Sequence, residues 1–185
     1  MPATQLAPAP GFIAESRLLT AAHDVAAAVH GGPLGSGRTS LRHPVAVAGL
    51  LHEAGYPAHV LAAALLHDVV EDGSIDPGRL EERFGPRIAR LVDQPTEDAA
   101  IPSFARRKAT LRERAVGSGH EAAAIFAADK LATVRALLER GESPPPEKLE
   151  HYRRSLWVLQ ARHPEVPFLA ELAADLRRLT AARRR

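Results

Sequence analysis

The sequence has 185 residues, enough for one hydrophobic core but too few for two ordinary domains joined by a linker. Apolar residues make up 45% and charged residues 25%, which excludes a wholly disordered chain. The net charge is only +2, and residues 151–185 hold eight Arg against three acidic residues. The basic excess therefore lies near the C-terminus and does not indicate a nucleic-acid-binding groove. Cysteine is absent, which excludes disulfides, thiolate metal ligands and cysteine nucleophiles.

We expect a single domain over residues 11–182, with a flexible leader at 1–10 and a solvated basic tail at 183–185. Residues 1–10 contain neither the basic nor the apolar segment of a signal peptide. No run approaches the ~18 consecutive apolar residues of a membrane-spanning helix. We therefore expect a cytoplasmic protein without a membrane or nucleic-acid partner. The sequence leaves its oligomeric state open.

Apolar residues recur at spacings of three and four along nearly the whole chain, and strand-like alternation with polar residues is missing. This pattern predicts an all-α fold. Helix breakers such as Gly31-Gly32-Pro33 and Gly55-Tyr56-Pro57 divide it into segments. From first to last, helices are predicted at 12–30, 44–54, 58–71, 77–84, 86–93, 103–116, 120–140, 146–162 and 166–182.

The third predicted helix contains an apolar run that we expect to be buried, followed by a group of ionisable residues. Its run 61–66 is wholly apolar, and His67, Asp68, Glu71 and Asp72 follow within six residues. Burying these four groups together is costly unless a strong opposite charge is present, and a divalent cation would supply it. Helical spacing places His67 beside Glu71 and Asp68 beside Asp72. We expect His67 and Asp68 to bind one ion, and Glu71 and Asp72 to face whatever approaches that ion.

Two further residues complete a candidate ligand set. His43 begins the second predicted helix, and Asp129 is an isolated acid at the end of the apolar run 124–128. Together they make a set of two His and two Asp, donors that suit manganese, iron, zinc or nickel better than calcium. Alternatively, Asp129 caps a helix or pairs with Lys130, and a His-Asp pair alone is common in proteins without a metal.

The order of the motifs resembles that of HD-domain hydrolases of the RelA/SpoT type, in particular their small single-domain metazoan members. The resemblance covers residues 18–155 and rests on His43-Pro44, Leu65-Leu66-His67-Asp68-Val69-Val70-Glu71-Asp72, Phe84-Gly85, Leu91-Val92 and Ala128-Asp129-Lys130-Leu131. It implies an HD-domain bundle of about 8–10 helices. It also implies a manganese ion, or another divalent transition metal, and hydrolysis of the 3′-pyrophosphate of the alarmone guanosine 3′,5′-bis(diphosphate). By the same resemblance the metal ligands are His43, His67, Asp68 and Asp129, and the acid/base pair is Glu71 and Asp72.

We expect nearby basic and polar residues to hold the nucleotide substrate, namely Arg38, Arg107, Lys130, Thr133 and Tyr152. Leu34 stands where the family has an Arg that packs on guanine, and Ser40, Ala99 and Thr133 also depart from its pattern. Arg38 is a candidate replacement for the missing cation. These departures leave two alternatives: a phosphohydrolase for another nucleotide, such as an adenosine analogue or a phosphorylated dinucleotide, and a non-catalytic nucleotide-binding HD module. The presence of Glu71 and Asp72 favours an enzyme.

Overall fold

The computed structural model describes residues 9–30, 41–70, 75–94, 97 and 100–182, which form ten helices and no β-strand. The predicted all-α fold is therefore confirmed. The helices are α1 (Gly11–Ala14), α2 (Arg17–His30), α3 (Arg42–Glu53), α4 (Ala58–Leu66), α5 (Pro77–Phe84), α6 (Pro86–Asp93), α7 (Phe104–Gly117), α8 (His120–Arg140), α9 (Pro146–Arg162) and α10 (Leu169–Ala182). None of these described helices combines the length and the apolar character that a membrane span requires.

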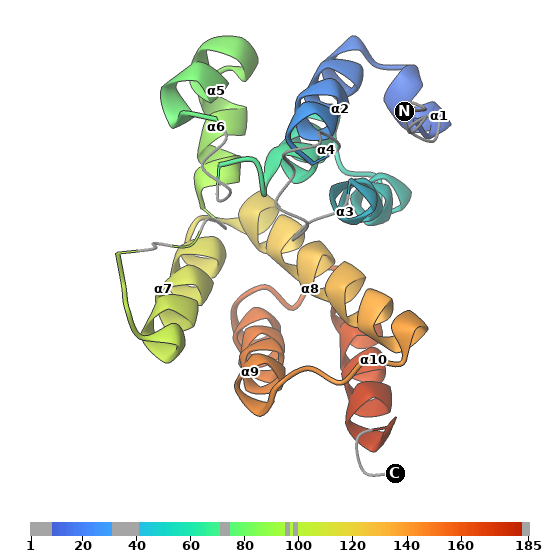
Figure 1. The fold of residues 1–185 in the computed structure, drawn as a ribbon, viewed down its shortest axis with the longest axis vertical. Helices are drawn as coiled ribbons and strands as arrows, with labels where there is room; N and C mark the ends of the chain where they lie inside the picture. Colours follow the sequence, from blue (N-terminus) through green and yellow to red (C-terminus); the bar gives the residue numbers. More distant parts are fainter. Residues whose placement is uncertain (1–8, 31–40, 71–74, 95–96, 98–99, 183–185) are drawn as a thin grey trace, which may run out of the picture.

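The long helix α8 is the centre of the fold. It runs through the middle of the molecule, with α1–α6 on one side and α7, α9 and α10 on the other (Figure 1). It packs against α3, α4, α7, α9 and α10. Its residues 122–128 are all buried, as expected for a helix that is apolar around its whole circumference. Side chains in this segment of α8 are therefore surrounded by the core.

Helix α4 is the second buried element. Its residues 60–66 are all buried, and the helix packs against α2, α3, α6 and α8. Hydrophobic burial stabilises a protein by about 25 cal/mol per Å² of apolar surface, so this short helix contributes strongly to the core. The polar residues that follow α4 consequently begin inside the molecule.

Two predicted helices differ from the observed ones. The first is divided into α1 and α2, because the Ser16 Oγ accepts a hydrogen bond from the Leu19 backbone N–H (3.4 Å) and begins a new helix there. The third was predicted to reach residue 71, but α4 ends at Leu66 and residues 67–70 form a turn. Residues 71 and 72 lie outside the described residues, so the predicted position of Glu71 and Asp72 beside His67 and Asp68 stays a prediction. The remaining predicted helices agree with the structure to within a few residues.

The packing predicts unequal effects of two substitutions on α9. Leu159 is fully buried, whereas Trp157 on the same helix is 70% exposed. Leu159→Ala should lower the free energy of unfolding by ~2–5 kcal/mol, because it removes buried surface and leaves a cavity. Trp157→Ala should change it by no more than ~0.5 kcal/mol. Urea denaturation of both variants measures these effects, and equal losses would contradict the assigned orientation of α9.

Candidate metal centre

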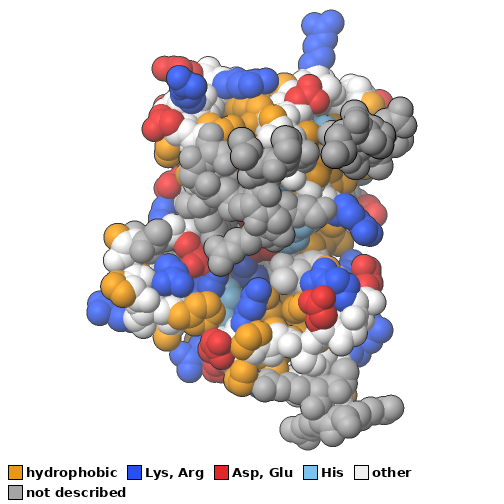
Figure 2. Space-filling view, in the orientation of Figure 1, with side chains coloured by type: hydrophobic (Ala, Val, Ile, Leu, Met, Phe, Trp, Pro, Cys, Tyr) orange, Lys and Arg blue, Asp and Glu red, His pale blue; other side chains and the backbone are white. Residues whose placement is uncertain are grey.

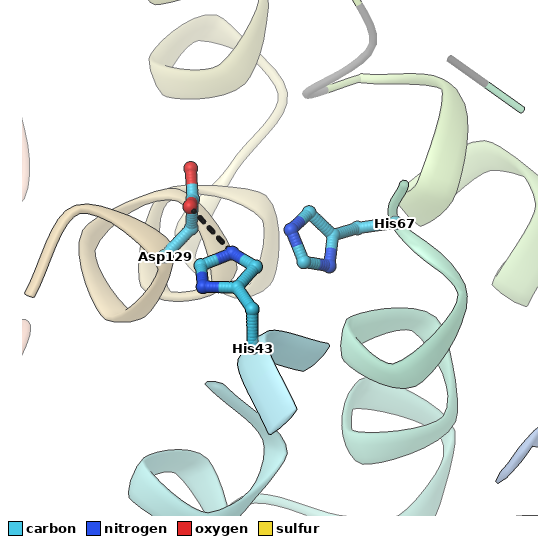
Figure 3. Close-up of side chains that lie close together, drawn as sticks. All are labelled: His43, His67 and Asp129. Atoms are coloured by element: carbon cyan, nitrogen blue, oxygen red, sulfur yellow. Dashed lines mark ion pairs between the residues drawn. The ribbon is translucent and has the colours of Figure 1, made fainter. Parts of the chain in front are cut away.

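Three helices bring together side chains that are far apart in the sequence. His43 lies in the first turn of α3, His67 directly follows α4, and Asp129 lies near the middle of α8. Because α3 packs against both α4 and α8, the three side chains converge. One donor atom of each lies within 4.8 Å of the others. Figure 3 shows the two imidazole rings and the carboxylate gathered around a common point.

His43 and Asp129 form a hydrogen-bonded ion pair, with His43 Nε2 3.1 Å from Asp129 Oδ1. Burial lowers the pKa of His43, but the hydrogen bond to Asp129 and the charges of Asp129 and Asp68 outweigh it and raise the pKa above its usual value. Burial raises the pKa of Asp129, but Lys130, His43 and His67 together hold it well below its usual range. Asp129 is therefore a deprotonated carboxylate at neutral pH.

His67 directs its Nε2 atom toward the same point. Its Nδ1 lies 2.7 Å from the Ala64 carbonyl oxygen, which can only accept, so Nδ1 carries the hydrogen and donates it. In the neutral ring Nε2 then carries a lone pair and no hydrogen. This nitrogen lies 3.0 Å from Asp68 Oδ1. Within the described part of the chain, His67 Nε2 and Asp68 Oδ2 are buried atoms without a hydrogen-bond partner.

These unpartnered atoms fit a divalent cation. A buried lone pair that faces a carboxylate is unfavourable by itself, because both atoms are acceptors. A cation between them would satisfy both, and the bond from His67 Nδ1 to a backbone carbonyl is the support that metal-bound histidines usually have. His43, His67, Asp68 and Asp129 together offer imidazole and carboxylate donors, the mixture that suits first-row transition metals.

Lys130 and Thr133 both contact Asp129. The Lys130 ammonium forms an ion pair with Asp129, and it also lies 4.6 Å from the centre of the Phe126 ring. Thr133 Oγ1 donates to Asp129 Oδ1 at 3.3 Å. The alternative interpretation of Asp129, a pair with Lys130, thus describes a real contact. It does not exclude a metal, because the other carboxylate oxygen faces His43.

The Arg107 guanidinium forms hydrogen bonds within the protein. Its guanidinium donates to Glu97 Oε2 at 2.8 Å and to the Ile101 carbonyl at 2.9 Å. Lys108 pairs with the same Glu97. The structure therefore gives Arg107 a role in holding the segment before α7, and its predicted contact with substrate stays a prediction.

Tyr152 lies close to the candidate centre. It is buried on α9, and burial and the negative charge of Asp129 raise the pKa of its hydroxyl above the usual value. Within the described residues, this hydroxyl has no hydrogen-bond partner. Tyr152 is therefore a donor available to a ligand.

Several predicted site residues and departures from the family pattern lie outside the described residues. They are Arg38, Glu71 and Asp72, and the departures at Leu34, Ser40 and Ala99.

A buried histidine, which was not among the predicted site residues, lies beside this site. His151 is 3% exposed, and its Nδ1 accepts a hydrogen bond from Arg112 at 2.9 Å, so its Nε2 carries the hydrogen. That Nε2 is buried and finds no hydrogen-bond partner among the described residues. Burial, together with the positive charges of Lys130, Lys108 and Arg112, lowers the pKa of His151 to about 2. Only the four-residue spacing of Lys108 and Arg112 on α7 hints at this cluster in the sequence.

Comparison with known proteins places this geometry in a family. The family model described as HD domain matches residues 21–162. Human guanosine-3′,5′-bis(diphosphate) 3′-pyrophosphohydrolase MESH1 is 40% identical over 103 residues, which are 55% of this chain and 57% of that protein. The alignment thus spans little more than half of the human relative.

Two solved structures share the fold. A protein from Listeria monocytogenes superposes with a TM-score of 0.66 at 29% identity, covering 74% of this chain and 97% of the other. The second, described as a metazoan ortholog of SpoT that hydrolyses ppGpp, superposes with a TM-score of 0.72 at 25% identity. It covers 95% of this chain and 99% of that one.

The lowered pKa of His151 predicts a pH-dependent loss of stability. The ring is neutral in the folded protein down to about pH 2, but it takes up a proton near pH 6.5 once the chain unfolds. Below pH 6.5 the unfolded state therefore binds more protons than the folded state. As the pH is lowered through this range, the free energy of unfolding decreases by up to ~1.4 kcal/mol per pH unit. His151→Gln should remove the contribution of this ring to the pH dependence of stability. Wild type should therefore lose more stability than the variant when the pH is lowered from 7 to 5.

Urea denaturation at several pH values measures the difference. The exposed His52 is the matched control, and His52→Gln should keep the pH dependence of wild type. Parallel stability curves for wild type and His151→Gln would show that His151 is protonated in the folded protein.

Proposed function

The chain belongs to the HD-domain family, and we propose that it is a metal-dependent hydrolase that removes pyrophosphate from the 3′ position of guanosine 3′,5′-bis(diphosphate). The observation that carries the proposal is the convergence of His43, His67 and Asp129. Two buried ligand atoms beside them, His67 Nε2 and Asp68 Oδ2, have no hydrogen-bond partner among the described residues. The human relative is named for this reaction, and the metazoan SpoT ortholog is described as hydrolysing ppGpp, which supports the same substrate class.

We propose that manganese is the ion and that its ligands are His43, His67, Asp68 and Asp129. When bound, such an ion supplies positive charge to a pyrophosphate group and makes a nearby water more acidic. The protein supplies the orientation. The Ala64 carbonyl fixes the ring of His67, and Thr133 and Lys130 fix the carboxylate of Asp129.

Glu71 and Asp72 are the proposed acid/base pair, since they follow His67 and Asp68 by only a few residues. One carboxylate takes a proton from the attacking water, and the hydroxyl oxygen bonds to the phosphorus nearest the ribose. The bond from that phosphorus to the 3′ oxygen breaks, and the other carboxyl group of the pair, protonated beforehand, gives its proton to the 3′ oxygen. The products are pyrophosphate and guanosine 5′-diphosphate, so atoms and charge balance without a nucleophilic side chain.

The buried His151 and Tyr152 are suited to bind the phosphate groups. His151 Nε2 and the Tyr152 hydroxyl are hydrogen-bond donors without a partner in the described part of the protein. The charges of Lys108, Arg112 and Lys130 act on the same ring of His151 and favour an anion beside it. On the face shown in Figure 2, Lys and Arg side chains lie next to histidine near the middle of the molecule. The two buried donors and the three nearby cations favour a ligand with several negative charges.

The proposal is tested with a nucleotide panel. The purified full chain, loaded with manganese, is incubated with guanosine 3′,5′-bis(diphosphate) and with its adenosine counterpart, and the products are separated by chromatography. We expect pyrophosphate from both, because Leu34 lacks the cation–π contact of ~0.5–2 kcal/mol that an Arg would make with guanine. Leu34→Arg should then raise the preference for guanine by about 2- to 30-fold. Failure to release pyrophosphate from either nucleotide would contradict the proposed reaction.

Two substitutions separate metal binding from chemistry. Asp129→Ala should lose manganese and activity together, because it removes a charged ligand from the centre of the site. Glu71→Gln should keep manganese but lower kcat by ~10²–10⁴-fold, the usual contribution of a general acid/base. Metal analysis after gel filtration and steady-state kinetics measure both, with His52→Gln as the control that should change neither. Full manganese occupancy in Asp129→Ala would remove that residue from the ligand set.

A further inference from the structure

A second cluster of histidine and carboxylate donors lies at the start of α8. His120 Nδ1 is 3.0 Å and His163 Nδ1 is 3.2 Å from Oε1 of Glu165. Donor atoms of all three residues lie within 4.8 Å of one another. We call these three residues the surface cluster. His120 precedes Asp129 by nine residues, or about 14 Å along the helix, so this cluster is separate from the candidate metal centre.

The hydrogen bond on the far side of His163 determines what its Nδ1 offers. His163 Nε2 lies 2.8 Å from the Val116 carbonyl oxygen, which can only accept, so Nε2 carries a hydrogen. In the neutral ring Nδ1 is then a lone pair that faces the Glu165 carboxylate. Two acceptors at this distance are stable together only with a cation between them or a second proton on the ring. A bond from the far nitrogen to a backbone carbonyl is the usual support of a metal-bound histidine.

His120 is held in a matching orientation. Its Nε2 lies 2.8 Å from the Tyr56 hydroxyl, and its ring stacks on Tyr56 with 5.6 Å between the ring centres. Tyr56 belongs to the turn between α3 and α4 and packs in turn on Phe168. These contacts direct His120 Nδ1 toward Glu165. Both imidazoles thus have one nitrogen occupied by the protein and the other turned to the same carboxylate oxygen.

The separation of each imidazole Nδ1 from the Glu165 carboxylate oxygen suits a small transition-metal ion. Two bonds of ~2.1 Å at a tetrahedral angle hold two ligand atoms ~3.4 Å apart, close to the 3.0 and 3.2 Å observed here. The neighbouring Glu121 does not compete, since its Oε1 binds His59 and Arg87 at 2.9 Å each. Nitrogen donors from two imidazoles favour zinc over calcium or magnesium, which prefer oxygen.

We propose that His120, His163 and Glu165 form a second metal site that binds one zinc ion. The ion joins the first turn of α8 to the turn between α9 and α10. Through the contact of His120 with Tyr56, it also fixes the turn between α3 and α4. Glu165 and His120 are exposed, so the remaining coordination position is open to water. The site stabilises the junction of these three turns.

The test counts zinc ions bound by the full chain. Protein stripped with a chelator is titrated with zinc chloride in a calorimeter at pH 7.5, and bound zinc is measured after gel filtration. Wild type should bind two ions per chain, whereas Glu165→Gln and His120→Gln should each bind one. The exposed His52→Gln is the matched control and should bind two. The same zinc stoichiometry in wild type and Glu165→Gln would overturn the proposal.

The Asp129→Ala variant separates the two sites. It should retain one zinc ion, and zinc should raise its Tm, because a ligand that binds only the folded state stabilises it. Adding Glu165→Gln to this variant should remove both the ion and the rise in Tm. Circular dichroism verifies that each variant remains helical. If Asp129→Ala binds no zinc, the surface cluster is held by protons alone and the second site does not exist, whatever the outcome for hydrolysis.

Discussion

The burial of α4 is the constraint on which the rest of the structure depends. Residues 60–66 are buried on every side, so the chain leaves this helix inside the core rather than at the surface. His67 and Asp68 therefore stand where polar groups are costly. The Ala64 carbonyl satisfies one nitrogen of His67, and no other described residue satisfies the second. His43 and Asp129 converge on the same point, where the Lys130 ammonium pairs with Asp129 while His67 Nε2 and Asp68 Oδ2 keep no described partner.

The fold could be predicted largely from periodicity, because nearly every helix buries an apolar stripe or its whole circumference. The errors occur where a single side chain overrides the pattern. Ser16 interrupts an apolar repeat that continues across it, since its hydroxyl binds the Leu19 backbone N–H. His67 ends α4 in a sequence that still reads as helical, since its ring binds a carbonyl of the preceding turn. Such local hydrogen bonds leave the hydrophobic pattern unchanged and so cannot be read from it.

The candidate centre could be predicted in part for a different reason. His43, His67 and Asp129 were recognisable as polar residues next to apolar runs, and buried runs from three helices must meet in one core. Contacts between polar residues that do not adjoin an apolar run have no such pattern in the sequence. The hydrogen bond of Arg107 to Glu97, ten residues earlier, is one such contact, and no hydrophobic pattern marks it. His151 and Arg112 lie 39 residues apart, and only the packing of α7 on α9 joins them.

Helix α8 carries one residue of each cluster, His120 at its start and Asp129 near its middle. Nine residues at 100° each amount to two and a half turns, so His120 and Asp129 lie on opposite faces of the helix, about 14 Å apart along its axis. That separation exceeds the Debye length of ~8 Å at physiological ionic strength, which screens the exposed His120 and Glu165, whereas the largely buried Asp129 is screened much less. The buried segment 122–128 of α8 lies between the two clusters, and its dense packing allows few alternative arrangements of the helix. The direction in which Asp129 points is fixed locally, by its contacts with His43, Lys130 and Thr133.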